Sequence, residues 1–275
     1  MREGVRLPDI IKVIILGIVQ GITEYLPVSS TGHLIVAAAL LDFGAGLGGT
    51  FEIFIQVGSV VAVLIFYRAE LWQQVRAVRT DAGVRRFWWG VALAFVPAAV
   101  IGFLLKDWIK SGLYSPVVVA ISLIVGGVAF LIIERTGLAE GADTHQITDI
   151  RPLQALGIGL AQCIALIPGV SRSGASIIGG MLVKLDRPTA TRFSFFLAIP
   201  TLGGATLYDL LTSLDRLQPG DLVNLLLGAG VAALVSLAAM GWLLRYVARN
   251  DFTAFGFYRT VIGGVILLLV AASII

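Results

Sequence analysis

Six apolar segments set the limits on how this chain can fold. Each approaches the ~20 residues that a helix needs to cross a bilayer. They are residues 50–67, 88–105, 116–133, 193–211, 223–244 and 257–274. These runs are continuous, whereas the strands of a membrane barrel alternate in polarity over about 10 residues. The sequence therefore predicts an all-α polytopic membrane protein with about six full transmembrane helices.

Composition agrees with a membrane protein and removes other classes. Hydrophobic residues make up 57% of the 275 residues and charged residues only 13%, against about 25% charged residues in a soluble domain. The net charge of +3 is explained by Lys and Arg in cytoplasmic loops, so no nucleic-acid partner is expected. The single cysteine, Cys163, excludes an intramolecular disulfide and a cysteine-based metal cage.

Two polar strings interrupt the apolar sequence. They are Glu24-Tyr-Leu-Pro-Val-Ser-Ser-Thr-Gly-His33 and Pro168-Gly-Val-Ser-Arg-Ser-Gly-Ala-Ser176. Pro and Gly break helices, and broken backbone at membrane depth is tolerated only inside protein or beside a wet cavity. Short apolar arms flank each string, over 8–26, 31–41, 153–167 and 174–183. We therefore expect two re-entrant helical hairpins, 8–41 and 153–183, whose turns form one polar site.

The sequence also repeats itself after about 140 residues. Leu16-Gly-Ile matches Leu156-Gly-Ile, Pro27-Val-Ser-Ser matches Pro168-Gly-Val-Ser, and the block that begins at Phe51 matches the block that begins at Phe193. Repeats of this size in a membrane protein place the site at their interface. We divide the single membrane domain, 1–275, into repeat one (about 8–133), a cytoplasmic linker (134–152) and repeat two (about 153–275).

Loop charges indicate how the two repeats are oriented. The loop after the first span of repeat one holds five arginines, whereas loop 209–221 holds three aspartates and one arginine. By the positive-inside rule the first loop is cytoplasmic and the second is outside, which makes this an inverted-topology repeat. Both termini then lie outside, and the inside loops are 134–152, 184–192 and 245–259.

The polar strings carry the residues from which a site can be built. Gln20 and Glu24 are four residues apart and share one helical face. Ser29 or Ser30 can cap the helix that follows, and Arg172 lies where the corresponding helix of the second hairpin begins. Helix starts bind anions through free amides and a positive dipole, and an arginine fork suits phosphate oxygens. Two such helix starts that face each other predict a phosphate pocket.

Structural interpretations of these residues stay open at this point. Helix capping alone accounts for Ser29, Thr31 and Ser176. His33 can be a hydrogen-bonded packing residue, and Arg172 can lock the hairpins together.

Further structural interpretations concern the spans. Glu52, which begins a span, can lie at the membrane interface, although with Glu24 it can also act as a base or as a metal ligand. Gln56 fits a hydrogen bond between helices better than a catalytic role. Glycine pairs such as Gly126-Gly127 fit close helix packing, within one chain or in a homodimer, which is the oligomer we expect.

The motifs resemble a known family. Gln20-Gly-Ile-Thr-Glu24, Pro27-Val-Ser-Ser-Thr-Gly-His33 and the Pro168–Ser176 string resemble undecaprenyl-diphosphate phosphatases of the bacitracin-resistance type. The resemblance covers nearly the whole chain. It implies an enzyme of the bacterial inner membrane that removes the terminal phosphate of a polyprenyl diphosphate lipid. The product is the lipid carrier of peptidoglycan synthesis, and the site is expected to open toward the periplasmic face.

The resemblance also implies roles for individual residues. The positions that match catalytic residues are Glu24, Ser30, His33 and Arg172. The positions that match the substrate-binding lining are Ser29, Thr31, Glu52, Ser171 and Ser173. Gln20 and Ser176 depart from the usual glutamate and threonine, and we assign both to substrate contacts, because Gln20 cannot act as a base.

Several points of the expected chemistry stay open. Ser30 is the favoured nucleophile, with His33 or Glu24 as the base, but attack by water activated by Glu24 or by His33 itself is also consistent with the residues. A divalent cation, Mg²⁺ or Ca²⁺, can bridge Glu24, Glu52 and the diphosphate, because hard oxygen ligands suit both ions. No organic cofactor is expected.

A secondary transporter or flippase of an anionic lipid or a small anion is the alternative function, because inverted repeats with broken helices are typical of transporters. The combination of nucleophile, base and arginine exceeds what an anion carrier needs, and therefore favours the enzyme. A purely structural membrane subunit would leave Glu24 and Arg172 without a purpose.

The charge pattern makes a testable prediction of topology. A cysteine introduced within 72–84 should react with an impermeant thiol reagent only from the cytoplasm, and one within 214–220 only from outside. Cys163→Ser provides the background without native thiols. Reaction of both positions from the same side would contradict the inverted repeat.

Overall fold

The computed structural model describes residues 8–43, 50–137, 140–213 and 221–274. The described chain is helical and contains no β-strand beyond an isolated bridge between Thr144 and Leu185. Its helices are α1 Asp9–Thr23, α2 Ser30–Leu40, α3 Thr50–Phe66, α4 Arg68–Ala77, α5 Ala82–Gly112, α6 Pro116–Thr136, α7 Pro152–Cys163, α8 Arg172–Leu182, α9 Arg187–Ser213, α10 Asp221–Val247 and α11 Thr253–Ala271, with 3₁₀ turns η1 Ile147–Asp149 and η2 Ile164–Leu166.

Several of these helices can cross a membrane, which makes the chain a multi-pass membrane protein. Four helices in the described chain are long and apolar enough: Ala82–Ile109, Pro116–Thr136, Leu222–Val247 and Thr253–Ala271. A fifth span results if the broken pair α3–α4, bent by 65°, is counted as one. The predicted segment 193–211 forms the middle of α9, which contains Pro200 and is not among these spans. The number of six therefore stays a prediction.

Three loops expected from the sequence are partly helical. The arginine-rich loop after the first span contains α4. The 184–192 segment holds the start of α9, and Asp186 accepts a hydrogen bond from the Thr189 amide there at 2.8 Å. The predicted 245–259 loop is wrong at its end, because α11 begins at Thr253 and places Arg259 inside the helix rather than in a loop.

The pairs α1–α2 and α7–α8 share one local geometry. Both α2 and α8 are 11 residues long. The residues before them, Ser29 and Ser171, have φ angles of 72° and 77°, and the residues after them, Asp42 and Lys184, have φ angles of 48° and 73°. Both serines accept a hydrogen bond from the amide three residues on. The local structure thus repeats with a constant offset of 142 residues, one more than the match of Pro27 with Pro168.

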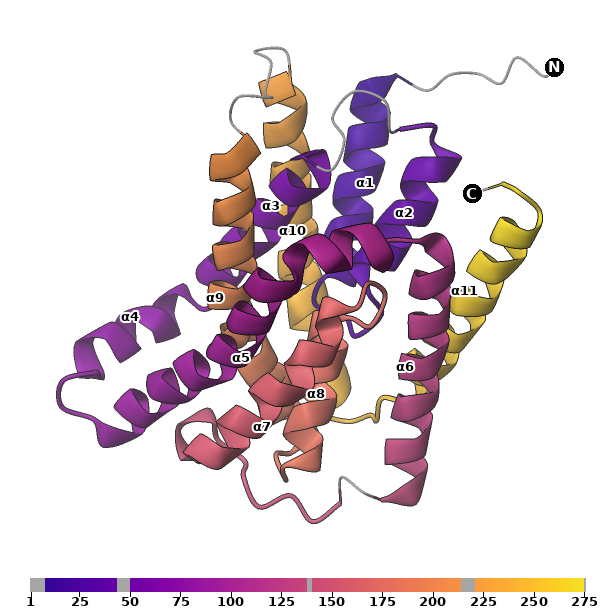
Figure 1. Cartoon of the computed structure of the whole chain (residues 1–275). Coiled ribbons are helices and arrows are strands. Elements are labelled where there is room, and N and C mark those ends of the chain that lie inside the picture. The colour runs from indigo at the N-terminus through magenta and orange to yellow at the C-terminus, as the bar shows by residue number, and fades with distance from the viewer. Residues whose placement is uncertain (1–7, 44–49, 138–139, 214–220, 275) are drawn as a thin grey trace.

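The two hairpins approach each other from opposite ends of the molecule, and their turns meet near its middle (Figure 1). The Ser173 hydroxyl donates to the Leu26 carbonyl across this meeting point at 3.0 Å. Each first arm packs against a long helix of the other half, α1 against α10 and α7 against α5. Helix α3 contacts both α9 and α10, and α6 lies along α11. Neither half can therefore bury its own hairpin alone.

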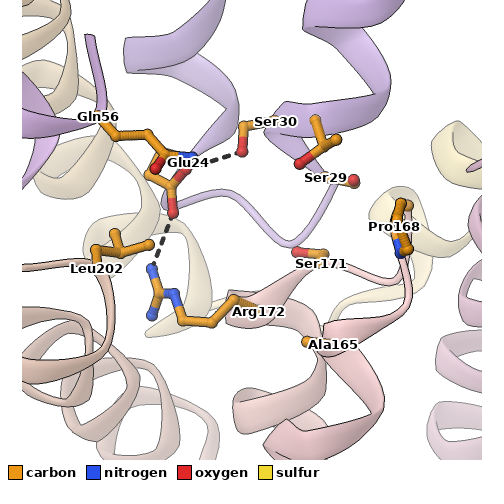
Figure 2. A pocket seen from close by; sticks show the side chains of 11 residues that line it. Glu24, Ser29, Ser30, Gln56, Ala165, Pro168, Ser171, Arg172 and Leu202 are labelled. Atoms are coloured by element: carbon orange, nitrogen blue, oxygen red, sulfur yellow. Dashed lines mark hydrogen bonds and ion pairs between the residues drawn. The ribbon is translucent and has the colours of Figure 1, made fainter. Parts of the chain in front are cut away.

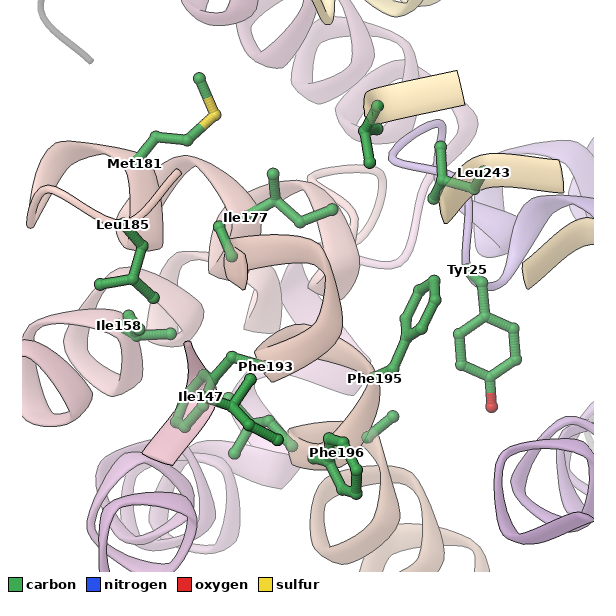
Figure 3. Packing of buried hydrophobic residues seen from close by; sticks show 14 of the residues in the cluster. Tyr25, Ile147, Ile158, Ile177, Met181, Leu185, Phe193, Phe195, Phe196 and Leu243 are labelled. Atoms are coloured by element: carbon green, nitrogen blue, oxygen red, sulfur yellow. The ribbon is translucent and has the colours of Figure 1, made fainter. Parts of the chain in front are cut away.

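An aromatic cluster of α9 packs against Tyr25, in the turn of the first hairpin (Figure 3). Phe196 of α9 meets Phe87 of α5 edge to face, with ring centres 5.0 Å apart. Phe195 meets Tyr25 in the same way at 5.2 Å, and the Tyr25 hydroxyl donates to the Ser59 carbonyl. Such aromatic pairs add directional contacts to the burial of the rings. They fix the backbone of the residue that follows Glu24.

Arg259 of α11 connects both turns. Its side chain is 0% exposed, and its guanidinium donates to the carbonyls of Pro27 at 2.9 Å and Val170 at 2.8 Å. Further donations reach Gly169 and Ser122. A Cβ atom at Gly126 would lie 2.2 Å from this guanidinium, so only glycine leaves room for it. One cation therefore satisfies carbonyls of two turns inside the protein, where an unpaired carbonyl would be costly.

Arg259→Lys should test this role. An ammonium has three donors and no planar fork, so it cannot reach carbonyls on three elements. Loss of two or more charge-assisted hydrogen bonds should lower the free energy of unfolding by about 2–4 kcal/mol. Thermal unfolding in detergent measures the change, and Arg135→Lys, at an exposed arginine, is the control. An unchanged melting temperature for Arg259→Lys would contradict the assignment.

Candidate active site

A cavity of about 100 Å³ lies where the two turns meet (Figure 2). Both hairpins contribute to its wall, together with α3 and α9. The lining residues are Glu24, Ser29, Ser30, Thr31, Gln56, Ala165, Pro168, Gly169, Ser171, Arg172 and Leu202. Residues of both polar strings thus line one cavity, as the sequence predicted.

Glu24 is the centre of the hydrogen bonds in the cavity. It follows the last turn of α1 and is 5% exposed. One carboxylate oxygen, Oε2, accepts from the Ser30 hydroxyl at 2.8 Å and from the Gln20 amide at 3.1 Å. The other, Oε1, lies 3.4 Å from Arg172 Nη2. The carboxylate is thus held between an uncharged hydroxyl of its own hairpin and a guanidinium of the other.

Arg172 is the first residue of α8, and its fork is held from α9. Nη1 donates to the Ser194 carbonyl at 2.9 Å, and the guanidinium carbon lies 5.9 Å from the centre of the Tyr25 ring. Nε is buried and has no hydrogen-bond partner among the described residues. A buried N–H without an acceptor is costly.

Two helix starts face the cavity. Ser29 caps α2 by accepting from the Gly32 amide at 3.4 Å, and Ser171 caps α8 by accepting from the Gly174 amide at 3.1 Å. Both serines have the positive φ that non-glycine residues rarely adopt. Strained backbone of this kind persists where the surrounding structure enforces it, as at binding sites. The N-terminal ends of both 11-residue helices therefore lie at one cavity, and helix N-termini favour anions.

Three residues predicted to contact substrate lie outside the cavity lining. Gln20 is fully buried and bridges Glu24 to the Ser59 hydroxyl. Ser173 donates to Leu26 of the opposite turn. Ser176 donates to the Arg172 carbonyl at 2.9 Å and to the Ser194 hydroxyl at 2.7 Å. All three contact residues of the cavity wall: Gln20 contacts Glu24, Ser176 contacts Arg172, and the Ser173 hydroxyl lies 3.0 Å from that of Ser171.

His33 also points away from the cavity. Its Nδ1 lies 2.8 Å from the Ser29 carbonyl, and its Nε2 lies 2.7 Å from the Tyr258 hydroxyl. A carbonyl only accepts, so Nδ1 carries the proton, and Nε2 of a neutral ring accepts from Tyr258. The two rings lie parallel, with centres 5.6 Å apart. In this arrangement both nitrogens are engaged, and neither faces Ser30.

Two residues of α3 differ in what can be said of them. The side chain of Glu52 lies outside the described part of the structure. Gln56, one helical turn further on, lies in the cavity wall beside Glu24 (Figure 2), and no described residue forms a hydrogen bond with it. The described residues therefore offer no hydrogen-bond partner that would support the interpretation of Gln56 as a link between helices. Among the described residues, no three His, Cys, Asp or Glu side chains form a metal-binding group.

Sequence reasoning missed several supporting residues. Ser236 and Ser59 extend the buried chain of polar groups from Gln20, with 3.1 Å between their hydroxyls. Tyr258, Ser194 and Arg259 also contact site residues. Of these residues, only Arg259 could have been identified from the sequence, because a charged residue inside an apolar run marks a functional or structural site. The others are ordinary hydroxyl-bearing residues in helices.

Comparison with known proteins agrees with this geometry. The family model described as bacitracin resistance protein BacA matches residues 13–265. An undecaprenyl-diphosphatase of Deinococcus radiodurans is 48% identical over 95% of this chain and 96% of its own length. Undecaprenyl-diphosphatase 1 of Paraburkholderia xenovorans is 48% identical over 94% of each chain. An undecaprenyl-diphosphatase of Methylobacillus flagellatus is 45% identical, over 94% of this chain and 97% of its own. The chain belongs to the bacitracin resistance protein BacA family.

Proposed function

We infer that this protein is an integral-membrane phosphatase that hydrolyses undecaprenyl diphosphate to undecaprenyl phosphate and inorganic phosphate. The names of its relatives support this activity, and nothing in the comparisons supports the transporter alternative. The contact of Ser30 with Glu24, beside Arg172 of the other hairpin, is the observation that carries the inference. The reaction recycles the lipid carrier for peptidoglycan synthesis and accounts for bacitracin resistance.

We propose Ser30 as the nucleophile and Glu24 as its base. The Ser30 proton already points at Glu24 Oε2, 2.8 Å away. As Glu24 takes it, Ser30 Oγ bonds to the terminal phosphorus, and the bond from that phosphorus to the bridging oxygen breaks. The proton then leaves with undecaprenyl phosphate. Water then attacks the phosphoserine phosphorus as Glu24 takes its proton, the bond from that phosphorus to Ser30 Oγ breaks, and Glu24 returns the proton to Ser30 Oγ as inorganic phosphate leaves.

Arg172 and the helix starts supply the electrostatic part of catalysis. Phosphoryl transfer depends on positioning and on stabilising charge on the moving phosphate oxygens. Arg172 and the first residues of α2 and α8 line the same cavity. We propose that they bind the terminal phosphate, with Ser29, Thr31 and Ser171 in the wall. His33 then has a supporting role, because its ring faces Tyr258.

A divalent cation remains part of the proposal. The cavity contains one described carboxylate, Glu24, and hydroxyl oxygens. This donor set fits Mg²⁺ or Ca²⁺ when the diphosphate itself supplies further oxygens. Glu24 would hold the ion, together with Glu52, and the ion would neutralise charge on the diphosphate.

We propose that the hairpins are re-entrant and that the two halves form an inverted repeat. Two observations support this arrangement. Ser29 and Ser171 are offset by 142 residues, and the first arm of each hairpin packs against the other half, α1 against α10 and α7 against α5. The site would open to the periplasmic side of the inner membrane, with both termini outside and about six spans. A homodimer is a further proposal. Gly264 supports it, because no other described helix lies within 4 Å of a Cβ built there, which leaves this position of α11 open to a neighbouring helix.

The activity and the role of Arg172 can be tested together. The purified protein should release inorganic phosphate from undecaprenyl diphosphate in detergent. Arg172→Lys keeps the charge but loses the fork, so activity should fall at least about 100-fold. Arg249→Lys, at an exposed turn, is the control. Absence of phosphate release by the parent protein would refute the function, whereas full activity of Arg172→Lys would remove only Arg172 from the site.

The order of bond formation is also testable. If Ser30 attacks and Glu24 is its base, acid quenching of a single turnover should trap phosphoserine at Ser30. Ser30→Ala and Glu24→Gln should each lower turnover about 10³-fold or more, and His33→Gln should retain more activity than either. Mass spectrometry locates the phosphate, and solvent labelled with oxygen-18 identifies direct attack. Labelled phosphate without any phosphoenzyme would establish attack by water, and phosphohistidine would establish attack by His33.

A further inference from the structure

One face of α4 carries exposed cations and an exposed indole. Trp72 and Val75 are 57% and 64% exposed, and the Arg76 guanidinium lies 4.7 Å from the centre of the Trp72 ring. With 3.6 residues per turn, these side chains share a stripe along α4 and the turn after it. We define the α4 surface as Arg68, Trp72, Val75 and Arg76 of α4, Arg79 of the turn after it and Arg85 at the start of α5, all of which are exposed.

The opposite face of α4 is attached to the body of the protein. Both carboxylate oxygens of Glu70 accept from Arg192 of α9 at 3.0 Å. Gln74, which is 6% exposed, donates to Glu70 at 3.2 Å. These contacts hold α4 in one rotational orientation, so the α4 surface faces outward.

The cations of the α4 surface lack acidic partners. Within the described chain, no carboxylate forms an ion pair with any of its four arginines. Arg85 Nη1 donates instead to the Arg79 carbonyl at 3.1 Å, which brings two positive residues together. The neighbouring Asp81 is occupied in capping α5 through the Gly83 and Val84 amides. Exposed guanidiniums without acidic partners suit the phosphate of an anionic ligand.

The position of α4 next to α3 indicates which anionic ligand the α4 surface would bind. The helix follows α3 directly and leaves its direction by 65°, as a segment does where a span meets the membrane surface. Trp is enriched at this depth, and basic segments beside spans attract anionic lipids. We propose that the α4 surface binds the headgroups of anionic phospholipids. This interaction is separate from the phosphatase reaction.

Native mass spectrometry with phosphatidylglycerol and phosphatidylcholine tests the proposal. The parent protein should bind phosphatidylglycerol at least about 10-fold more tightly than phosphatidylcholine, because arginines near a membrane surface attract anionic lipids. The variant Arg76→Gln/Arg79→Gln/Arg85→Gln should lose this preference. The control Arg135→Gln/Arg245→Gln/Arg249→Gln removes equal charge from other exposed positions and should keep it. Phosphatase activity in neutral lipid should be the same in all three proteins, which confirms folding.

A second measurement reports on the α4 surface itself. An environment-sensitive dye on Val75→Cys, in a Cys163→Ser background, should shift to the blue with phosphatidylglycerol and not with phosphatidylcholine, and high salt should weaken the shift. The proposal is overturned if the parent protein shows no lipid preference, if both triple variants lose it equally, or if the dye does not respond. Retained preference in the α4 variant overturns it as well.

Discussion

The buried guanidinium of Arg259 is the interaction on which the site depends. Two helices are broken inside the protein, and each break leaves carbonyl groups that no helix satisfies. Donors from a single side chain reach both turns, at Pro27 and at Gly169–Val170. The backbone thereby gains partners, and the two turns acquire a fixed spacing. Ser30 and Glu24 of one hairpin meet Arg172 of the other because of that spacing.

The charges near the cavity explain why an anion is favoured there. Arg172 forms an ion pair with Glu24, whereas Arg259 donates only to carbonyls and forms no ion pair with a described residue. One carboxylate thus faces two cations in the described site. The dipoles of α2 and α8 add to the positive potential. Without substrate the excess charge is costly, and a diphosphate supplies the missing negative charge in a water-poor environment where attraction is strong.

Local patterns in the sequence predicted much of this structure, since they depend on neighbouring residues. The arms and turns of both hairpins, the helix starts at Ser29–Ser30 and Ser171–Arg172, and the meeting of the two strings were all predicted. The direction in which a side chain points was harder to predict, because it depends on helices that are distant in sequence. His33 turns toward Tyr258, 225 residues away, and Gln20 turns toward Ser59. Helix α4 was missed because its polar, arginine-rich sequence is typical of a loop.

The crossed packing of the hairpins has a consequence for biogenesis. The partner of α1 is α10, which is synthesised about 200 residues later. At a translation rate of about 5–20 residues per second, α1 waits roughly 10–40 s for this partner. Ser59, the partner of Gln20, follows it by 39 residues, but Arg172 follows Glu24 by 148 residues, so for most of that interval Glu24 lacks its cation and the first hairpin is a poor membrane segment on its own. The active site is therefore assembled late, when the last third of the chain enters the membrane and completes both halves together.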